Sequence, residues 1–398
     1  MNRQLSINPY IFGYVSKDYA NGLPRGEVRL DCSLGVSPRP LQASVFTKLR
    51  ELPLGSSSDA IKYYPHSEAL KRTLADWYRR NGVGESWMTE KNFLLGNGSY
   101  DILCSLNLLC LSKGDRVLGH APQFTAYVDH VNCIGAEYDA YYLRRENGYL
   151  FEADAYLEKM SRAHRLFIVE NPNNPTGQVI ALEDLEKIAK KAAQLGRLLV
   201  VDEAYGEYLP ARSSAMNLIP GYPNVVVTRT FSKGFGMAGL RLGYAVGNRG
   251  EDGVLPQLQK LLLPFNSNSI ARILAQATLE SLMEEGKGLW AALDSESLTA
   301  QKQVLLRAIQ RLNGEYGRSL RVAATAEHTP IMTLFYDEGG EGFHLQSHLM
   351  RYGLLTVSCE GYLGLGPGVV RLMLPHPTQS ALLVRLLGDA IRELPVLL

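Results

Sequence analysis

Cysteine is sparse in this chain, and its spacing argues against a small protein held together by disulfide bonds or by zinc. There are 5 cysteines among 398 residues, and none lies in a C-x-x-C pair or at another metal-ligand spacing. An odd, scattered set of thiols suits a reducing compartment, so we expect neither a disulfide framework nor a zinc site. Cys104 and Cys110 fall in an apolar run, where a thiol behaves as a small hydrophobic side chain.

An excess of charge of one sign is also missing, as are long apolar runs. The formal net charge is +1, which argues against a nucleic-acid or membrane-surface protein. No run reaches the roughly 18 apolar residues of a membrane-spanning helix, and residues 1–22 lack the apolar stretch of a secretion signal. We therefore expect a cytoplasmic protein with no nucleic-acid and no membrane partner.

Apolar strand patterns alternate with helical ones along the middle of the chain. Examples are RLFIVENPNNPTG at 165–177, the amphipathic LEDLEKIAKKAAQLG at 182–196, and RLLVVDEAY at 197–205. This alternation predicts parallel βαβ units in a sheet that is covered on both faces. Ligands of such sheets bind beyond the carboxyl ends of the strands. The polar clusters ENPNNPTG, DEAY and TFSKG follow three strands, so we expect them to meet at one site.

The pattern changes after the last of these strands. Residues 270–315 read as one long helix or two, followed by short strands and a closing amphipathic helix. We expect a large domain over residues 46–265 and a smaller α+β domain over 266–398, with a hinge in LLLPFNSNS at 261–269. Residues 1–45, rich in Pro, Gly and Asn, are predicted to form an arm that contributes to the small domain and to an active-site lid.

The segment TRTFSKGFGMAGLRLGY at 228–244 places a lysine between hydroxyl groups and a glycine-rich run. A lysine amine can bind an aldehyde covalently, and a pyridine aldehyde whose ring nitrogen is protonated can act as an electron sink. Lys233 is the candidate amine, and Asp202, at the end of a strand, is the candidate partner of the ring nitrogen. Tyr205 and Asn174 could donate to the ring oxygen.

A phosphate group on such a cofactor needs N–H donors, hydroxyls and a fixed cation. GNGSYD at 96–101 predicts a glycine-rich turn that opens a helix, where N–H groups and the helix dipole attract anions. Thr230 and Ser232 offer hydroxyls, and Arg241 offers a guanidinium that stays charged. Phe124 is the candidate to cover the ring face. Each of these residues alone is equally typical of a cap, a turn or a core, so the signal is their combination.

The combined motifs resemble the fold-type I, pyridoxal 5′-phosphate-dependent aminotransferases of class I and II, and the histidinol-phosphate aminotransferase branch most. The resemblance implies an α/β fold with a mostly parallel seven-stranded sheet between helices, plus a smaller α+β domain. It also implies a homodimer with shared active sites. It rests on YYP at 63–65, GNGSYD at 96–101, PQFTAY at 122–127, NPNNPTG at 171–177, VDEAY at 201–205, TFSKGFGMAGLRLGY at 230–244 and VRLML at 370–374.

The resemblance also implies residue roles. Lys233 would form the Schiff base with pyridoxal phosphate and move a proton at the substrate α-carbon, with Asp202 and Tyr205 as the other catalytic residues. Arg371 and Asn174 would bind the substrate, Arg371 through the substrate carboxylate. Tyr64 would reach the cofactor phosphate of the neighbouring subunit. The other cofactor-binding residues would be Ser99, Tyr100, Phe124, Asn174, Asp202, Tyr205, Thr230, Ser232, Lys233 and Arg241. In relatives the arm folds over the site, so Tyr10, Phe12 and Tyr14 are the expected lid contacts.

The shared core serves several reactions on a free α-amino acid. Transamination is the expected one, and a lyase, decarboxylase or elimination and cyclisation reaction on the same scaffold is the alternative. A third possibility, a transcriptional regulator with an aminotransferase-like domain, is disfavoured because no helix-turn-helix segment precedes the arm and no basic stripe is present.

One departure from the resembled branch bears on the substrate. Histidinol-phosphate aminotransferases carry a phosphate-binding arginine shortly before the position of Arg371. Here no arginine stands between Arg351 and Arg371, and the stretch LLTVSCEGYLG contains Ser358 and Glu360 instead. Loss of a guanidinium removes charge-assisted bonds, and a glutamate would repel a phosphate. We therefore expect a substrate without phosphate. Glu360 suggests a basic, arginine-like substrate, unless it is a solvent-facing loop residue.

Overall fold

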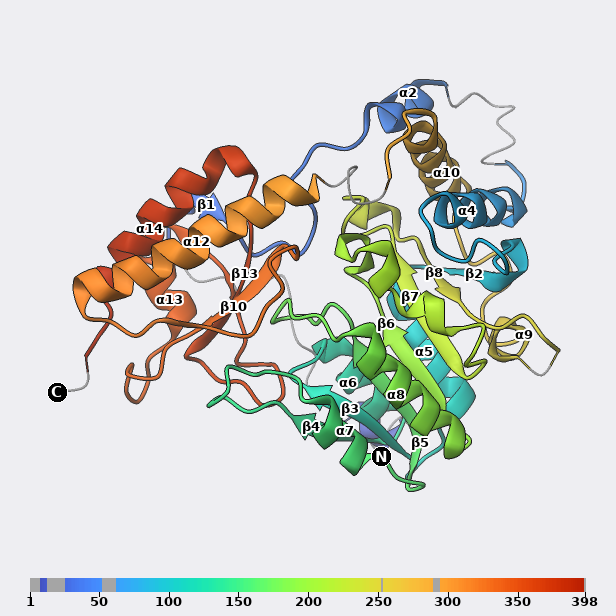
Figure 1. Cartoon of the computed structure of the whole chain (residues 1–398), viewed down its shortest axis with the longest axis horizontal. Coiled ribbons are helices and arrows are strands. Elements are labelled where there is room, and N and C mark those ends of the chain that lie inside the picture. Colours follow the sequence, from blue (N-terminus) through green and yellow to red (C-terminus); the bar gives the residue numbers. More distant parts are fainter. Residues whose placement is uncertain (1–7, 13–25, 52–61, 252, 289–293, 397–398) are drawn as a thin grey trace, which may run out of the picture.

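The computed structural model describes residues 8–12, 26–51, 62–251, 253–288 and 294–396. Its larger domain is built on a seven-stranded sheet with the strand order β2-β8-β7-β6-β5-β3-β4 (Figure 1). Only β8 runs against its neighbours. In that order the strands are Phe93–Gly96, Gly243–Val246, Val225–Thr230, Leu198–Asp202, His164–Glu170, Arg116–Ala121 and Glu137–Tyr142. The prediction of a mostly parallel, seven-stranded α/β sheet is confirmed.

Both faces of this sheet are buried, as the continuous apolar strand patterns indicate. In β7, Val225 and Val227 belong to one hydrophobic core and Val226 to the core on the other face. Helices α4, α7, α8 and α10 cover the first face, and α5, α6 and α9 cover the second. In that order they are Glu68–Arg80, Ala153–Lys159, Leu182–Gln194, Ser269–Glu284, Ser99–Cys110, Thr125–Cys133 and Val254–Gln259.

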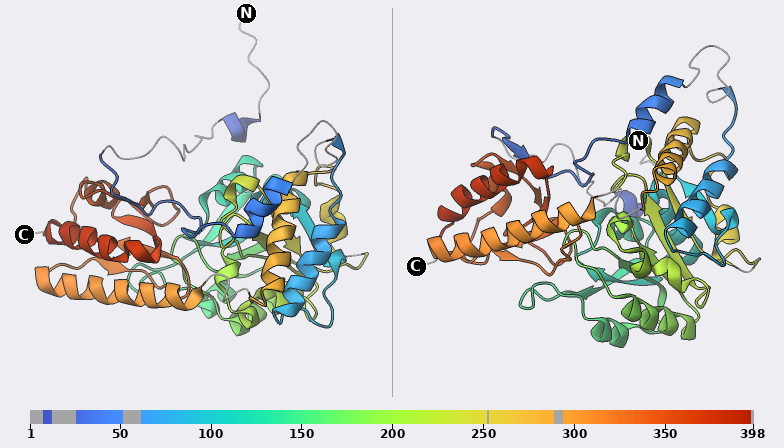
Figure 2. Two further views of the ribbon diagram at one scale, coloured as in Figure 1. Left: turned by 90° about the horizontal axis from the view of Figure 1, so that it is seen from above. Right: turned by 45° about the horizontal axis from the view of Figure 1, so that its top comes forward.

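The smaller domain contains a four-stranded antiparallel sheet with the order β12-β13-β10-β9. These strands are Val357–Ser358, Val369–Met373, Ile331–Phe335 and Arg321–Val322. Two helices, α12 (Ser295–Tyr316) and α14 (Ser380–Arg392), lie side by side along this domain (Figure 2). A third helix, α13 (Leu345–Met350), precedes β11 (Leu354–Leu355).

The N-terminal segment contributes to both domains. Strand β1 (Leu30–Asp31) pairs in parallel with β11, so Leu30 lies in the core of the small domain. Helix α2 (Ala43–Glu51) instead packs against α10. Helix α1 (Pro9–Phe12) lies against α6, and the Tyr10 ring contacts Gly135, just before β4. Tyr10 therefore lies at the amino end of β4 rather than at the carboxyl ends of the strands, whereas Tyr14 is outside the described residues.

Helix α10 packs with the large domain. Its side chains at Ala271, Leu274 and Leu279 share a core with α4, while α12 packs in the core of the small domain. We therefore propose that the domain boundary lies between α10 and α12, later in the chain than the hinge expected at 261–269.

Two properties of the described residues bear on function. None of the described helices has an apolar stretch long enough to cross a bilayer. Within the same part of the chain, no three His, Cys, Asp or Glu side chains gather in a way that suits a metal ion.

Candidate active site

A cavity of about 160 Å³ lies beyond the carboxyl ends of β5, β6 and β7. Every residue predicted to bind the cofactor from within one subunit lies in its lining. The lining consists of Ser99, Tyr100, Phe124, Glu170, Pro172, Asn174, Asp202, Ala204, Tyr205, Thr230, Ser232, Lys233, Ala238 and Arg241. The polar strand ends therefore meet at one site, as the sequence predicted.

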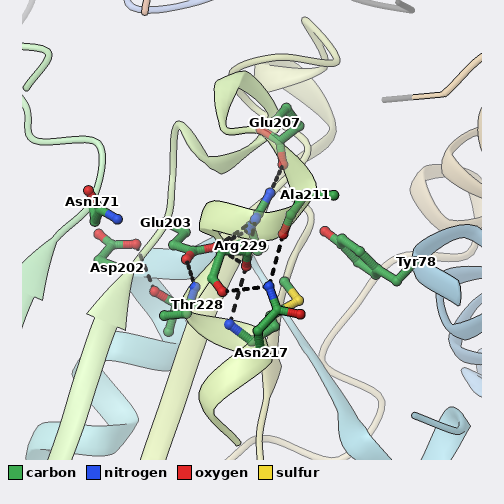
Figure 3. A network of polar contacts seen from close by, with 12 residues as sticks. Tyr78, Asn171, Asp202, Glu203, Glu207, Ala211, Asn217, Thr228 and Arg229 are labelled. Carbon is green, nitrogen blue, oxygen red and sulfur yellow. Dashed lines mark hydrogen bonds and ion pairs between the residues drawn. The ribbon is translucent and has the colours of Figure 1, made fainter. Parts of the chain in front are cut away.

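Asp202, the last residue of β6, provides a buried carboxylate in this cavity. Its side chain is only 4% exposed, and it accepts a 2.7 Å hydrogen bond from Thr228 Oγ1 (Figure 3). Burial raises the pKa of Asp202 to about 6, which shows that the site disfavours an uncompensated negative charge. A cationic ring nitrogen placed against Asp202 would supply the missing opposite charge.

An anion-binding cradle lies at the start of α5. Gly98, before the first residue of this helix, has φ 83°, and a Cβ there would lie 2.8 Å from Arg241 Nη2. The guanidinium therefore lies against the turn that opens this helix. Arg241 Nη1 is 3.5 Å from Ser232 Oγ, which in turn accepts a 2.9 Å bond from Thr230 Oγ1. Helix N–H groups, two hydroxyls and a permanent cation thus converge, which suits a phosphate.

Arg371 approaches the cavity from the small domain. Its Nη1 donates to Asn174 Oδ1 at 3.1 Å, and its Nη2 donates to the carbonyl of Ser33 at 2.6 Å. The side chain is 9% exposed, and among the described residues its buried Nε has no hydrogen-bond partner. Asn174 is a cavity residue, so a guanidinium with a free donor stands next to the site.

Known proteins are similar to this chain over most of its length. Residues 39–332 match the family model of class I and II aminotransferases. A histidinol-phosphate aminotransferase of Symbiobacterium thermophilum is 32% identical over 387 residues, which cover 95% of this chain and 97% of that protein. Another, from Cupriavidus pinatubonensis, is 31% identical over 334 residues, which cover 83% of this chain and 81% of that one.

The chain belongs to the class I and II aminotransferases.

Solved structures agree with this aminotransferase fold. Histidinol-phosphate aminotransferase from Sinorhizobium meliloti, in complex with pyridoxal-5′-phosphate, superposes with a TM-score of 0.76 at 21% identity, covering 99% of this chain and 100% of that one. An aspartate aminotransferase variant of Thermus thermophilus gives a TM-score of 0.78 at 18% identity, covering 97% and 100%. The aminotransferase uses pyridoxal phosphate, and the cavity fits it, with a cradle for the phosphate, a buried carboxylate and Lys233.

The arm supplies an aminotransferase residue that sequence reasoning missed. A Cβ on Gly35 would lie 2.6 Å from the Tyr205 hydroxyl and 3.2 Å from Lys233 Nζ. The Tyr205 hydroxyl also donates to the carbonyl of Gly35 at 3.3 Å. The arm was expected near the site, but a single glycine in a glycine-rich segment gives no signal of its own.

Besides Arg371, which stands next to the lining, Tyr64 and Glu360 also lie outside this cavity. Tyr64 is 74% exposed and stacks on Phe265, with ring centroids 4.5 Å apart. Glu360 has a side chain that is 57% exposed, and its carboxylate lies 3.6 Å from His344 Nδ1. The loop after β12 directs this carboxylate to the surface, and its suggested contact with a basic substrate stays a prediction.

A buried ionic network supports the site from behind, and sequence reasoning missed it as well. Arg229, on β7, donates from Nε to Glu203 at 2.8 Å and pairs with Glu207 at 3.6 Å (Figure 3). Glu207 also packs against Gly234, the residue after Lys233, because a Cβ on Gly234 would lie 2.5 Å from the Cβ of Glu207. The network therefore connects the end of β6, the end of β7 and the lysine segment.

Proposed function

We propose that this aminotransferase transfers the amino group of an α-amino acid whose side chain carries no phosphate. The observation that carries the proposal is the residue opposite Arg371. In the antiparallel pair of β12 and β13, Val357 is the direct partner of Arg371. Directly paired residues project from the same face of a sheet, with Cβ atoms about 5 Å apart. An apolar side chain therefore stands beside the guanidinium that would bind the substrate carboxylate.

The charges near the cavity support the same proposal. Lys233 and Arg241 are the cations among the described residues that line it. Arg241 is needed for the cofactor phosphate, Lys233 for covalent binding, and Arg371 for the substrate carboxylate. Between Val357 and Val370 the one ionised side chain is Glu360, which is exposed and anionic. A phosphate on the substrate would therefore lack charge-assisted hydrogen bonds worth about 1.5–3 kcal/mol each.

The proposed roles of the residues follow from their positions. When bound, pyridoxal phosphate supplies the electron sink that makes the substrate α-hydrogen acidic. Arg371 fixes the substrate carboxylate, so that the α-carbon faces Lys233. Lys233 would hold the aldehyde of the cofactor, and its amine, once released, would accept and return the proton at the substrate α-carbon. Asp202 holds the proton on the ring nitrogen, and Tyr205 and Asn174 donate to the ring oxygen.

Histidinol phosphate is the second candidate substrate. It is favoured by relatives of that name, one of which is 32% identical over 95% of this chain. A phosphate-binding cation supplied by a partner subunit would reconcile it with the apolar Val357.

A half-reaction assay separates the two candidates. The protein loaded with pyridoxal phosphate is mixed with single amino donors without an oxo-acid, and loss of the cofactor's visible absorbance is timed. The panel holds the common α-amino acids and the matched pair histidinol and histidinol phosphate. We expect an unphosphorylated α-amino acid to react fastest. A preference for histidinol phosphate over histidinol of 100-fold or more, about 2.7 kcal/mol, would contradict the proposal. Release of ammonia or carbon dioxide would identify the lyase alternative.

We also propose that the protein is a cytoplasmic homodimer with shared sites. Tyr64 and Phe265 form an exposed aromatic pair beside a hollow that includes Asn97 and Asn266. Exposed aromatic side chains of this kind are typical of subunit interfaces. All five cysteines are free, which agrees with a reducing compartment.

A further inference from the structure

Glu170 is a second buried carboxylate in the cavity, and none of the roles given above uses it. It is the last residue of β5 and is 3% exposed. In the parallel ladder between β5 and β6 it is the direct partner of Asp202. Both side chains line the cavity. The carboxylate predicted to face the ring nitrogen therefore has another carboxylate next to it.

The hydrogen bonds of Glu170 reach two different segments of the site. Oε1 accepts from the backbone N–H of Phe124 at 2.8 Å. Oε2 accepts from the backbone N–H of Asn174 at 3.2 Å and from Asn173 Nδ2 at 3.1 Å. One carboxylate thus fixes both Phe124, which is predicted to stack on the cofactor ring, and Asn174, which is predicted to bind the ring oxygen. Asn174 also accepts a hydrogen bond from Arg371.

We propose that Glu170 is a positioning residue, which holds Phe124 and Asn174 in place and, as a carboxylate beside Asp202, adds negative charge next to the cationic ring nitrogen. The inference rests on the roles assigned to Phe124, Asn174 and Asp202, and it does not depend on the identity of the amino donor.

Glu170 is expected to ionise when the cofactor is bound. Burial and Asp202 raise the pKa of Glu170 well above its usual value, although its three N–H donors lower it, and a cationic ring nitrogen beside the two carboxylates would lower it again. His120 Nε2 accepts the N–H of Glu170 at 3.1 Å, and burial lowers the pKa of this histidine to about 4, so it is neutral. Tyr138 and Tyr362 also interact electrostatically with Glu170, and burial raises the pKa of both hydroxyls, so they too are neutral.

The test compares two variants of the loaded enzyme in the absence of substrate. The first readout is the pH midpoint at which the visible absorbance band of the bound cofactor changes. Glu170→Gln removes a negative charge that favours the protonated form of the cofactor, so that form should lose its proton at a pH about one unit lower. Glu170→Asp keeps the charge and should leave the midpoint unchanged.

The second readout separates positioning from charge. Asp is one methylene shorter, so Glu170→Asp should loosen Phe124 and Asn174 and weaken the circular dichroism of the cofactor band at least twofold. Glu183→Gln, an exposed change on α8, is the matched control and should alter neither readout. A midpoint in Glu170→Gln equal to that of the unmodified protein would overturn the electrostatic part. Unchanged circular dichroism in Glu170→Asp would overturn the positioning part. A substrate panel that failed to support an unphosphorylated amino acid would affect neither measurement.

Discussion

At the scale of single residues, two glycines leave room for the groups that do the chemistry. Gly35 closes over Lys233 and Tyr205, and Gly98 lies against the Arg241 guanidinium. In both places an added Cβ would come within 3 Å of a side chain that the site uses. Activity should therefore respond to a single methyl group at these positions more than overall stability does.

Gly35→Ala should lower kcat/KM by 10- to 100-fold. The new methyl group would displace the Tyr205 hydroxyl and crowd Lys233 Nζ, and misplacing reacting groups by about 1 Å costs roughly this much. Steady-state kinetics and the melting temperature of both proteins provide the measurement. Gly366→Ala is the control, because a Cβ there meets nothing within 4 Å. Equal kinetics for Gly35→Ala and the unmodified protein would show that Gly35 does not confine the site.

Gly98→Ala should weaken the binding of pyridoxal phosphate by at least tenfold. Its φ of 83° strains any side chain, and the Cβ would press on Arg241. Gly82→Ala is a matched control, because Gly82 has φ 78° but faces open space. Both variants should lose similar stability, about 1 kcal/mol or more, and only Gly98→Ala should raise the Kd of the cofactor. A similar Kd in the two variants would refute the cradle.

At the same scale, the sequence predicted most of the site and missed Glu170, Gly35 and Arg229. The predicted residues follow strands in recognisable motifs, and the parallel sheet brings those strand ends together. Glu170 also ends a strand, but nothing local shows that its carboxylate turns back onto Phe124. Gly35 and Arg229 act through contacts with residues distant in sequence, which no local pattern reveals.

At the scale of elements, helix α12 is attached to the site through a buried lysine. Lys302 is 0% exposed, and its Nζ donates to the carbonyls of Ala326, Thr329 and Ile331 at 2.7–2.9 Å. The hydroxyl of Thr329 donates in turn to the carbonyl of Gly177, at the end of the segment that carries Asn174. The small domain is thereby tied to a wall of the cavity.

Lys302→Met should lower the free energy of unfolding by roughly 3 kcal/mol, because several buried carbonyls would lose their donor. The variant should also raise KM, since Asn174 orients Arg371. Thermal melting and steady-state kinetics provide the measurements. Lys190→Met, on the exposed side of α8, is the control. A variant with normal melting and normal KM would show that the carbonyls find other donors.

The directions of strands and the packing partners of helices were harder to predict than the positions of these elements in the sequence. Continuous apolar runs such as Val225–Val227 indicate a buried strand, but burial is the same whichever way a strand runs, so the reversal of β8 was not evident. The pattern of α10 likewise shows an apolar side without showing what covers it. The boundary proposed after α10 therefore rests on the packing of this helix against α4 and α2.

At the scale of the whole molecule, the proposed shared sites can be tested by mixing subunits. Lys233→Ala and Tyr64→Ala should each impair activity as separate homodimers. In a mixed dimer, one site would combine an intact Lys233 with the intact Tyr64 of the other chain. Equal mixtures should therefore regain about a quarter of the unmodified activity after subunit exchange. Unmixed variants kept under the same conditions are the control. If no activity returned although mixed dimers were detected by mass spectrometry, Tyr64 would act within its own subunit or not at all.

The route of the chain between the domains has a mechanical consequence. After β1 the chain passes from the small domain to α2, and after α10 it passes back to α12 (Figure 1). Arg39, in the first connection, forms a 2.8 Å ion pair with Asp294, at the end of the second. Rotation of one domain against the other would strain or release this half-exposed pair. Dissolved salt screens such pairs. Ionic strength should therefore weaken this contact between the two interdomain connections, as well as the ion pairs elsewhere on the surface.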